Sequence, residues 1–478
     1  MDKKEEIKAF LQNRITIGEA TLKAMTVGSD GKPFLRRSVA LVIDKYIKDF
    51  QAGKTEPRWV AIPGLRGVGK TTLIAQLYSS LNCEQGCKIY ISLDEALRVL
   101  NVSIGEILNV YEEMIGTSFE KLTKPIFIFL DEVQYDSTWG ITLKTLYDRT
   151  KKVFIICTGS SALSLQTNPD VARRVVFTKI YPLTFTEFQM LKTRKLPIKN
   201  LGSEIRKALF NSKTAEELFN QLKSLEKSVI AYWKNIPRTD LSEYLKFGTM
   251  PFALSLRHEP LIYSQINQTL NSVLNRDVPQ LGTFDKQTID KLSQILYAVA
   301  SYDTTSFNKV SGLVGLDIKT VINIFEALEK TELLHRVYPN GSHETQVKRA
   351  SKYLFTSPAF RAMYYNLIGS TSSFDDYKGK LFEDVVGLYL FRIFSRIQDM
   401  NLTYDSAEAG ADFIVGSAVS REGKIAIEAS LTNKGCEQLI NTMKKVSCRY
   451  GLLVSNSKLW IDDTKTCISV PLDYFLLI

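Results

Sequence analysis

The sequence predicts an α/β protein of several domains, and three observations lead to this fold class. The chain has 478 residues, which is longer than a domain with a single hydrophobic core usually is. Continuous apolar runs alternate with helical patterns over residues 58–157, which is typical of a parallel sheet covered by helices. A second alternation of helix and strand patterns follows residue 375. These features indicate at least two α/β regions separated by other structure.

The N-terminal elements follow from the spacing of apolar residues. Residues 1–57 have apolar positions at helical spacing and are predicted to form a helical N-terminal segment. Four apolar runs then predict buried strands at 58–63, 88–92, 126–130 and 153–157. Helical patterns such as 104–114 lie between these strands. Residues 191–284 are helical in pattern and rich in lysine.

A glycine-rich loop joins the first predicted strand to a predicted helix. Its residues are Gly64, Leu65, Arg66, Gly67, Val68, Gly69, Lys70 and Thr71, followed by Thr72. The glycines let the backbone bend so that successive N–H groups face phosphates, and the helix N-terminus favours an anion. Lys70 is expected to bridge the β- and γ-phosphates, and the hydroxyl of Thr71 to ligate Mg²⁺. The loop in this context predicts an ATP site with Mg²⁺.

An acidic pair ends the predicted strand 126–130 and forms a second, independent motif. Asp131 falls where Mg²⁺ would lie, as in the Walker B arrangement. Glu132 follows directly and can polarise the attacking water as general base. The alternative is an N-cap pair for the next helix. The two motifs together favour ATP hydrolysis over passive nucleotide binding.

Polar and basic residues follow the strand 153–157. Thr158 and Ser160 are equal candidates for contact with the γ-phosphate or the attacking water, and strand-end capping is the alternative. Arg173 and Arg174 are candidates for stabilising transition-state charge, in their own subunit or in a neighbouring one. A solvated surface pair is the alternative for these arginines. An arginine acting on a neighbour would require an oligomer.

The motifs at 64–72, 130–134, 158–162 and 181–188 occur in an order that resembles a known family. It is the archaeal-type AAA ATPase group of prokaryotes, which is similar to the signal-transduction ATPases. The resemblance implies an AAA+ ATPase core at 58–190, a helical lid at 191–284, a winged-helix domain at 285–370 and a C-terminal nuclease-like domain at 371–478. It implies no known substrate.

Residues 307–321 have the pattern of helix, turn and helix, with the turn expected at 312–315 and a wing strand at 334–338. In a DNA-binding winged helix, Lys319, Thr320 and Asn323 would face the groove. The second helix carries few basic residues. DNA contact and a purely structural role are therefore both open for this module.

Residues 371–478 resemble the restriction-endonuclease-like, PD-(D/E)XK fold. Glu383 lies on a predicted helix, Asp412 begins a strand and Glu428 lies near the end of the next strand. Such enzymes hold Mg²⁺ with carboxylates and place a lysine two residues after the second carboxylate. Ser430 occupies that position here, and Lys434 would have to reach back from the next segment. The domain is either a weakened nuclease or an inactive, DNA-binding fold, and the serine favours the second.

Composition limits the class of protein and its compartment. No run approaches the roughly 20 apolar residues of a membrane helix, and the charged N-terminus does not predict a signal peptide. A cytoplasmic location is expected. Six cysteines and three histidines lack metal-ligand spacing, so free thiols are expected rather than a zinc site or disulfides. The net charge of +10 permits a polyanionic partner.

Three functions are compatible with these observations. The leading hypothesis is an ATP-driven conformational switch that acts on or near double-stranded DNA, in defence against mobile elements. The second is an ATP-dependent DNA nuclease. The third is an ATP-binding regulatory or scaffold protein that acts on a protein partner without nucleic acid. Salt-sensitive binding of a DNA duplex would separate the third from the others.

Overall fold

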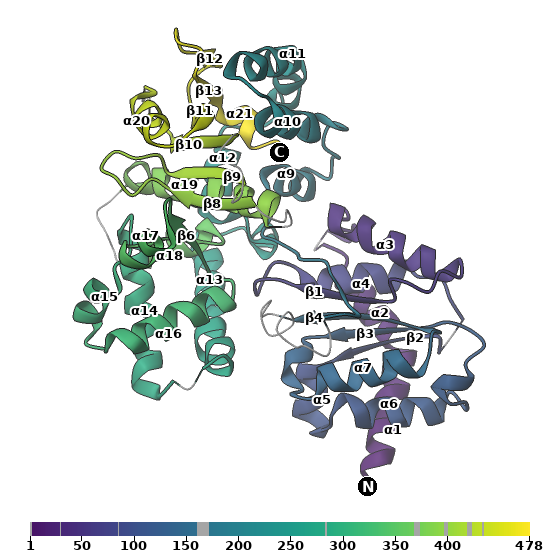
Figure 1. Ribbon diagram of the computed structural model, residues 1–478. Coiled ribbons are helices and arrows are strands. Elements are labelled where there is room, and N and C mark those ends of the chain that lie inside the picture. The colour runs from purple at the N-terminus through teal and green to yellow at the C-terminus, as the bar shows by residue number, and fades with distance from the viewer. Residues whose placement is uncertain are drawn as a thin grey trace. The chain divides into compact units, whose positions relative to one another are not determined.

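The computed structural model describes residues 2–28, 30–84, 86–159, 172–282, 284–367, 373–395, 400–417, 423–432 and 435–478. The chain divides into two compact units (Figure 1). The first contains residues 1–181 together with 330–332. The second contains residues 182–329 and 333–478.

The first unit is built on a five-stranded sheet in which every pair of neighbours is parallel. In sheet order the strands are β2 (Lys88–Ser92), β3 (Ile126–Asp131), β4 (Val153–Gly159), β1 (Trp59–Pro63) and β5 (Val176–Phe177). The predicted parallel α/β core is confirmed. Parallel strands require crossover connections, and helices supply most of them.

Side chains alternate between two buried faces of this sheet, which explains its continuous apolar runs. On one face, Phe127 and Phe154 meet Phe50 of α3 (Ser38–Gln51), with ring centroids 5.7 and 5.2 Å away. On the other face, Ile128 and Ile155 belong to a buried cluster with four other helices. These helices are α1 (Lys3–Thr16), α5 (Leu93–Leu100), α6 (Ile104–Met114) and α7 (Trp139–Arg149). Helices thus cover both faces (Figure 1).

The second unit begins with helices that pack on its C-terminal strands. They are α9 (Phe185–Thr193), α10 (Leu201–Asn211), α11 (Ala215–Trp233), α12 (Thr239–Glu243) and α13 (Glu259–Ser272). Arg449 on β11 (Cys448–Ser455) donates to the carbonyl oxygens of Phe210 and Ser212 at 3.1 and 3.0 Å. Tyr450 donates to the carbonyl oxygen of Leu209 at 2.6 Å. The segment predicted as a helical lid therefore contacts the C-terminal sheet.

The next helices contain the predicted helix–turn–helix. They are α14 (Lys286–Ser301), α15 (Phe307–Val314) and α16 (Ile318–Lys330). Gly315 ends α15 with φ +70°, a left-handed conformation that favours glycine. Gly312, expected to begin the turn, lies inside α15 instead. The turn therefore starts at the residue whose backbone requires it.

One eight-stranded sheet joins the predicted wing to the C-terminal region. Its order is β12 (Trp460–Ile461), β13 (Cys467–Pro471), β11, β10 (Lys424–Ser430), β9 (Phe413–Ser417), β8 (Met400–Tyr404), β6 (Leu334–Pro339) and β7 (Lys352–Phe355). β6 pairs with β7 antiparallel and with β8 parallel. The helices of this region are α17 (His343–Lys348), α18 (Pro358–Leu367), α19 (Phe374–Phe394), α20 (Glu437–Lys445) and α21 (Leu472–Phe475). The β6–β7 hairpin is thus continuous with the predicted nuclease-like core.

Cys436 and Cys467 form a disulfide with Cα atoms 6.4 Å apart. The expectation that all cysteines are free thiols is wrong for this pair. The two residues are 31 positions apart, and they meet because the start of α20 packs beside the first residue of β13 in one buried cluster.

In the described part of the chain, no helix is both long and apolar enough to cross a membrane.

Candidate functional site

The glycine-rich loop follows β1 and leads into α4 (Lys70–Ser80). Gly67 and Gly69 have φ of +87° and +93°, so an L side chain at either position would be strained. A Cβ on Gly64 would lie 2.4 Å from the carbonyl oxygen of Ile180. The loop therefore needs glycine for conformation at two positions and for close approach at a third.

Lys70 is buried at the start of α4, with 4% of its surface exposed. Its Nζ donates to the carbonyl oxygens of Gly64 and Leu65 at 3.1 and 3.4 Å, and lies 3.6 Å from Oε1 of Glu132. The ammonium is therefore shared between loop backbone and an acidic side chain. Bound phosphates would compete with these partners.

Arg37 contacts the glycine-rich loop, a role that the sequence motifs did not indicate. Its guanidinium donates to the carbonyl oxygens of Val68 and Tyr181 at 3.1 and 2.8 Å. Arg37 precedes α3 and is buried. The sequence gives no local pattern for this role, because the arginine and the loop are brought together only by packing.

Asp131 at the end of β3 accepts three hydrogen bonds. Thr71 Oγ1 donates to Oδ2 at 2.7 Å, and Tyr90 on β2 donates to the same oxygen at 3.2 Å. Thr158 on β4 donates to Oδ1, and its own oxygen accepts the backbone N–H of Glu132 at 3.0 Å. The predicted residues Thr71, Asp131 and Thr158 therefore meet at one point. Tyr90 is an additional contact that the motifs did not indicate.

The two acidic neighbours have opposite pKa shifts. Burial, helped by repulsion from Glu132, raises the pKa of Asp131. Burial alone would also raise the pKa of Glu132, but the charges of Lys70 and Arg66 outweigh it and lower that pKa. Gln134 also donates to Oε2 of Glu132. Glu132 is therefore ionised near neutral pH and able to accept a proton.

Glu132 also has a strained backbone, with φ +57° and ψ +51°. A residue with a Cβ adopts this left-handed conformation at a cost of about 1–2 kcal/mol. The conformation lies between the end of β3 and the short helix Val133–Tyr135. It turns the chain at the residue where a catalytic base is predicted.

Thr71 and Asp131 fit the chemistry of a bound Mg²⁺. Both offer oxygen donors, which this ion prefers, and they are already in hydrogen-bond contact. Among the described residues, no group of three or more His, Cys, Asp and Glu side chains could hold a metal ion. Mg²⁺ at nucleotide sites commonly has only one or two protein ligands, with phosphates and water completing the shell.

A cavity of about 500 Å³ opens beside these residues. Thr71, Asp131 and Glu132 line one side together with Arg66, and Arg14 of α1 lines the same space. Arg14 forms an ion pair with Glu95 on α5. The cavity therefore holds the two predicted acidic residues and two arginines within the first unit.

The other predicted residues of this region lie elsewhere. Arg173 is exposed, and Arg174 forms a bidentate ion pair with Asp148 on α7 at 2.8 and 2.9 Å. Neither is among the described residues that line the cavity. Ser160 lies outside the described residues. In the helix–turn–helix, Lys319 and Asn323 are exposed, whereas Thr320 donates its N–H and its hydroxyl to Asp317, which caps α16.

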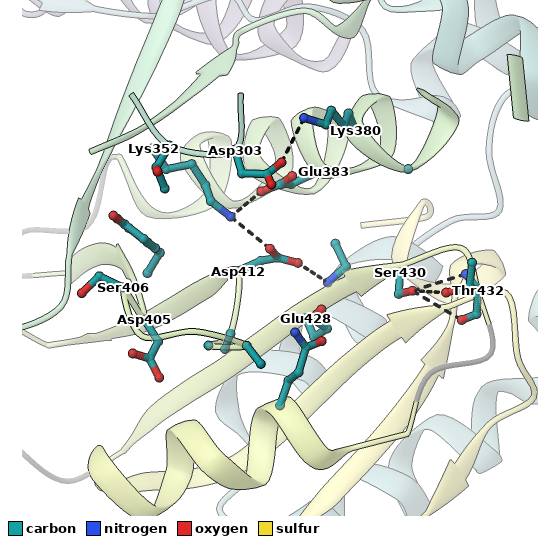
Figure 2. Close-up of a pocket in the computed structure, with 18 of the residues that line it drawn as sticks. Asp303, Lys352, Lys380, Glu383, Asp405, Ser406, Asp412, Glu428, Ser430 and Thr432 are labelled. Atoms are coloured by element: carbon teal, nitrogen blue, oxygen red, sulfur yellow. Dashed lines mark hydrogen bonds and ion pairs between the residues drawn. The ribbon is translucent and has the colours of Figure 1, made fainter. Parts of the chain in front are cut away.

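The second unit has a cavity of about 790 Å³ that brings together the predicted nuclease-like residues (Figure 2). Glu383 comes from α19, Asp412 directly precedes β9, and Glu428 lies on β10. Lys352, the first residue of β7, donates to Oε1 of Glu383 at 2.5 Å and to Oδ1 of Asp412 at 3.0 Å. Sequence reasoning did not single out Lys352.

Ser430 occupies the position where a lysine is expected, and its hydroxyl makes hydrogen bonds within its own loop. Its hydroxyl pairs with Oγ1 of Thr432 at 2.9 Å and accepts the N–H of Thr432 at 3.3 Å (Figure 2). Lys434, the predicted substitute, lies outside the described residues. Among the described residues, the lysine in contact with the carboxylates Glu383 and Asp412 is therefore Lys352.

Comparison with family models and known proteins gives matches for much of the chain. Residues 56–189 match a family model described as "AAA domain". Residues 238–370 match one described as "Domain of unknown function (DUF8612)". The uncharacterized protein MJ1637 of Methanocaldococcus jannaschii is 33% identical over 418 residues, covering 87% of this chain and 83% of that protein. The uncharacterized protein MJ1544 of the same organism is 22% identical, covering 97% and 95%.

Comparison with solved structures also gives matches, two of which follow. The Thermotoga maritima RuvB Holliday junction branch migration motor is 13% identical, with a TM-score of 0.29, covering 64% of this chain and 90% of that one. AMPPCP-bound DnaA from Aquifex aeolicus is 17% identical, with a TM-score of 0.24, covering 62% and 89%.

Proposed function

Since the chain belongs to the same family as MJ1637 of Methanocaldococcus jannaschii and carries an AAA domain, we propose that it hydrolyses ATP with Mg²⁺ and uses this reaction as a conformational switch. The observation that carries the proposal is Glu132, an ionised glutamate that lines a cavity together with Asp131. A site that only binds nucleotide has no need for this second carboxylate.

The chain's own residues supply distinct parts of the reaction. The loop backbone and the α4 N-terminus bind the phosphates, and Lys70 neutralises part of their charge. Thr71 and Asp131 would hold Mg²⁺, which when bound neutralises phosphate charge and orients the γ-phosphoryl group. Glu132 orients the attacking water and accepts its proton. Thr158 keeps Asp131 and the Glu132 backbone in register through two hydrogen bonds.

Phosphate release by the purified chain tests this proposal. Lys70→Ala removes the phosphate-binding ammonium and is expected to abolish turnover. Glu132→Gln removes the base and is expected to keep ATP binding while turnover is lost. Glu113→Gln, at an exposed glutamate on α6, is the matched control. Unchanged phosphate release in both site variants would contradict the assignment.

We further propose that the second unit associates with double-stranded DNA. The net charge of +10 and the exposed Lys319 and Asn323 on α16 support it. In this proposal residues 285–370 form a winged helix, residues 371–478 form a degenerate nuclease-like domain, and the protein works in the cytoplasm in defence against mobile elements.

A labelled duplex titrated at several salt concentrations tests the DNA contact. A steep salt slope is expected. No shift of the duplex would favour a regulatory or scaffold protein that acts on another protein.

A further inference from the structure

Lys352 reaches the carboxylate cluster from outside the elements that carry the carboxylates. Here the carboxylate cluster means Glu383, Asp412 and Glu428. Lys352 begins β7, which pairs with β6, and β6 pairs with β8 on the edge of the nuclease-like sheet. β8 in turn pairs with β9, the strand that Asp412 precedes. The pairing of these strands therefore places the Lys352 ammonium beside the carboxylate cluster.

The ammonium has the surroundings of a bound cation. Only 8% of the Lys352 side chain is exposed, and its Nζ contacts both Glu383 and Asp412. The rings of Tyr404 and Phe413 lie 5.7 and 5.6 Å from it, within the range of a cation–π contact. Two carboxylates and two aromatic rings therefore surround the ammonium.

Asp412 has both of its oxygens in use. Oδ1 accepts from Lys352, and Oδ2 accepts the backbone N–H of Ala429 at 3.0 Å (Figure 2). A Mg²⁺ ligand lies at about 2.0–2.1 Å from the ion, so a metal bound by Oε1 of Glu383 and Oδ1 of Asp412 would have to occupy the space of the ammonium. Two cations this close would also repel each other strongly. Ammonium and metal are therefore alternatives at these oxygens.

We propose that Lys352 is the resident cation of the carboxylate cluster, taking the position that a divalent metal would need and closing the nuclease-like site to metal. The inference concerns the nuclease-like domain of the proposed function and does not depend on ATP hydrolysis. It gives the degenerate domain a physical basis: the cluster lacks a lysine at position 430, and two of its three carboxylates are already paired with Lys352.

Removal of the Lys352 charge should open the cluster to a divalent ion. Lys352→Gln leaves Glu383, Asp412 and Glu428 without their internal cation, and oxygen donors of this kind suit Mn²⁺. Lys352→Arg retains the charge and should keep the cluster closed. Lys380→Gln is the matched control, because Lys380 lines the same cavity but pairs with the exposed Asp303.

Mn²⁺ binding to the full-length, nucleotide-free protein tests the proposal by electron paramagnetic resonance. The ATP site contributes equally to all variants, so the comparison isolates the cluster. Lys352→Gln is expected to gain one Mn²⁺ site at least roughly tenfold tighter than any in the wild type. The gain should vanish in Lys352→Gln/Asp412→Asn and be absent from Lys352→Arg and Lys380→Gln.

Two binding results would overturn the proposal, and the folding of Lys352→Gln provides a further test. Wild-type Mn²⁺ binding that Asp412→Asn abolishes would mean that Lys352 does not exclude metal. Absence of the new site in folded Lys352→Gln would mean that the ammonium does not replace a metal. If Lys352→Gln folds only with Mn²⁺, the proposal holds, and if it fails to fold with or without Mn²⁺, the proposal fails. Phosphate release measured on the same samples reports separately on the ATPase proposal.

Discussion

The ATP site and the carboxylate cluster contain the same kinds of residue and use them in opposite ways. Each places carboxylates near strand ends and has one buried lysine close by. Lys70 lies 3.6 Å from Glu132 and donates its hydrogen bonds to two loop carbonyls. Lys352 is in direct contact with Glu383 and Asp412. We therefore expect the position of the lysine, more than the set of residues, to decide whether acidic residues can receive a metal.

The largest expected effect separates the two sites by activity. Glu132→Gln should reduce ATP turnover by roughly 10²–10⁴-fold, the contribution typical of a general base, while ATP affinity is kept. Asp412→Asn should leave turnover unchanged, because the cluster takes no part in ATP hydrolysis. Steady-state phosphate release and nucleotide titration measure both. Equal losses of ATP turnover in the two variants would mean that the carboxylate cluster also takes part in ATP hydrolysis.

The next effect concerns the free energy of unfolding. Here the variant of the carboxylate cluster should show a larger loss than the variant of the ATP site. Lys352→Met leaves two half-buried carboxylates without their buried cation and should destabilise the second unit by about 3 kcal/mol, the lower end for a buried ion pair. Lys70→Met should cost less, because the Lys70 ammonium lies 3.6 Å from Glu132, farther than the Lys352 ammonium lies from Glu383 and Asp412. Urea unfolding followed by circular dichroism gives both values. A larger loss for Lys70→Met would reverse the comparison.

A smaller effect is expected within the ATP site itself. The pKa of Glu132 lies below its ordinary value of 4.5, so its ionised form stabilises the fold above that pH, and this stability is lost as pH falls through the lowered value. The pKa of Asp131 is raised above 3.8, so its ionised form destabilises the fold once pH exceeds the raised value. Near neutral pH, Glu132→Gln should destabilise the nucleotide-free protein and Asp131→Asn should stabilise it, each on the order of 1 kcal/mol. Unfolding at neutral and acidic pH checks the signs, and a shared sign would refute the assignment of opposite shifts.

The smallest effect is expected at the surface. Arg174 pairs with Asp148 in a partly exposed position, so Arg174→Ala should change stability by less than about 1 kcal/mol. Turnover should stay within a few fold if the arginine does not reach a nucleotide. Phosphate release measured over a range of protein concentrations provides the check. A concentration-dependent loss of about 10³-fold would instead assign Arg174 to the site of a neighbouring subunit.

How much the residues alone reveal differs between the two sites. The loop at 64–71 and the pair Asp131–Glu132 are contiguous motifs, and each follows a strand whose apolar pattern is visible in the sequence. Arg37, Tyr90 and Lys352 escape such reasoning, because each is remote in sequence from the group it contacts. The Cys436–Cys467 disulfide escapes it for the same reason.

The sequence by itself determined the α/β class, the parallel helix-covered core and the position of the phosphate loop, because these depend on local periodicity and on backbone conformations that glycine permits. Only the tertiary structure decided the order of the strands and the joining of the β6–β7 hairpin to the C-terminal sheet. It also decided which lysine contacts Glu383 and Asp412. Strand pairing brings residues together across any distance in the chain, and that information resides in the assembled sheet.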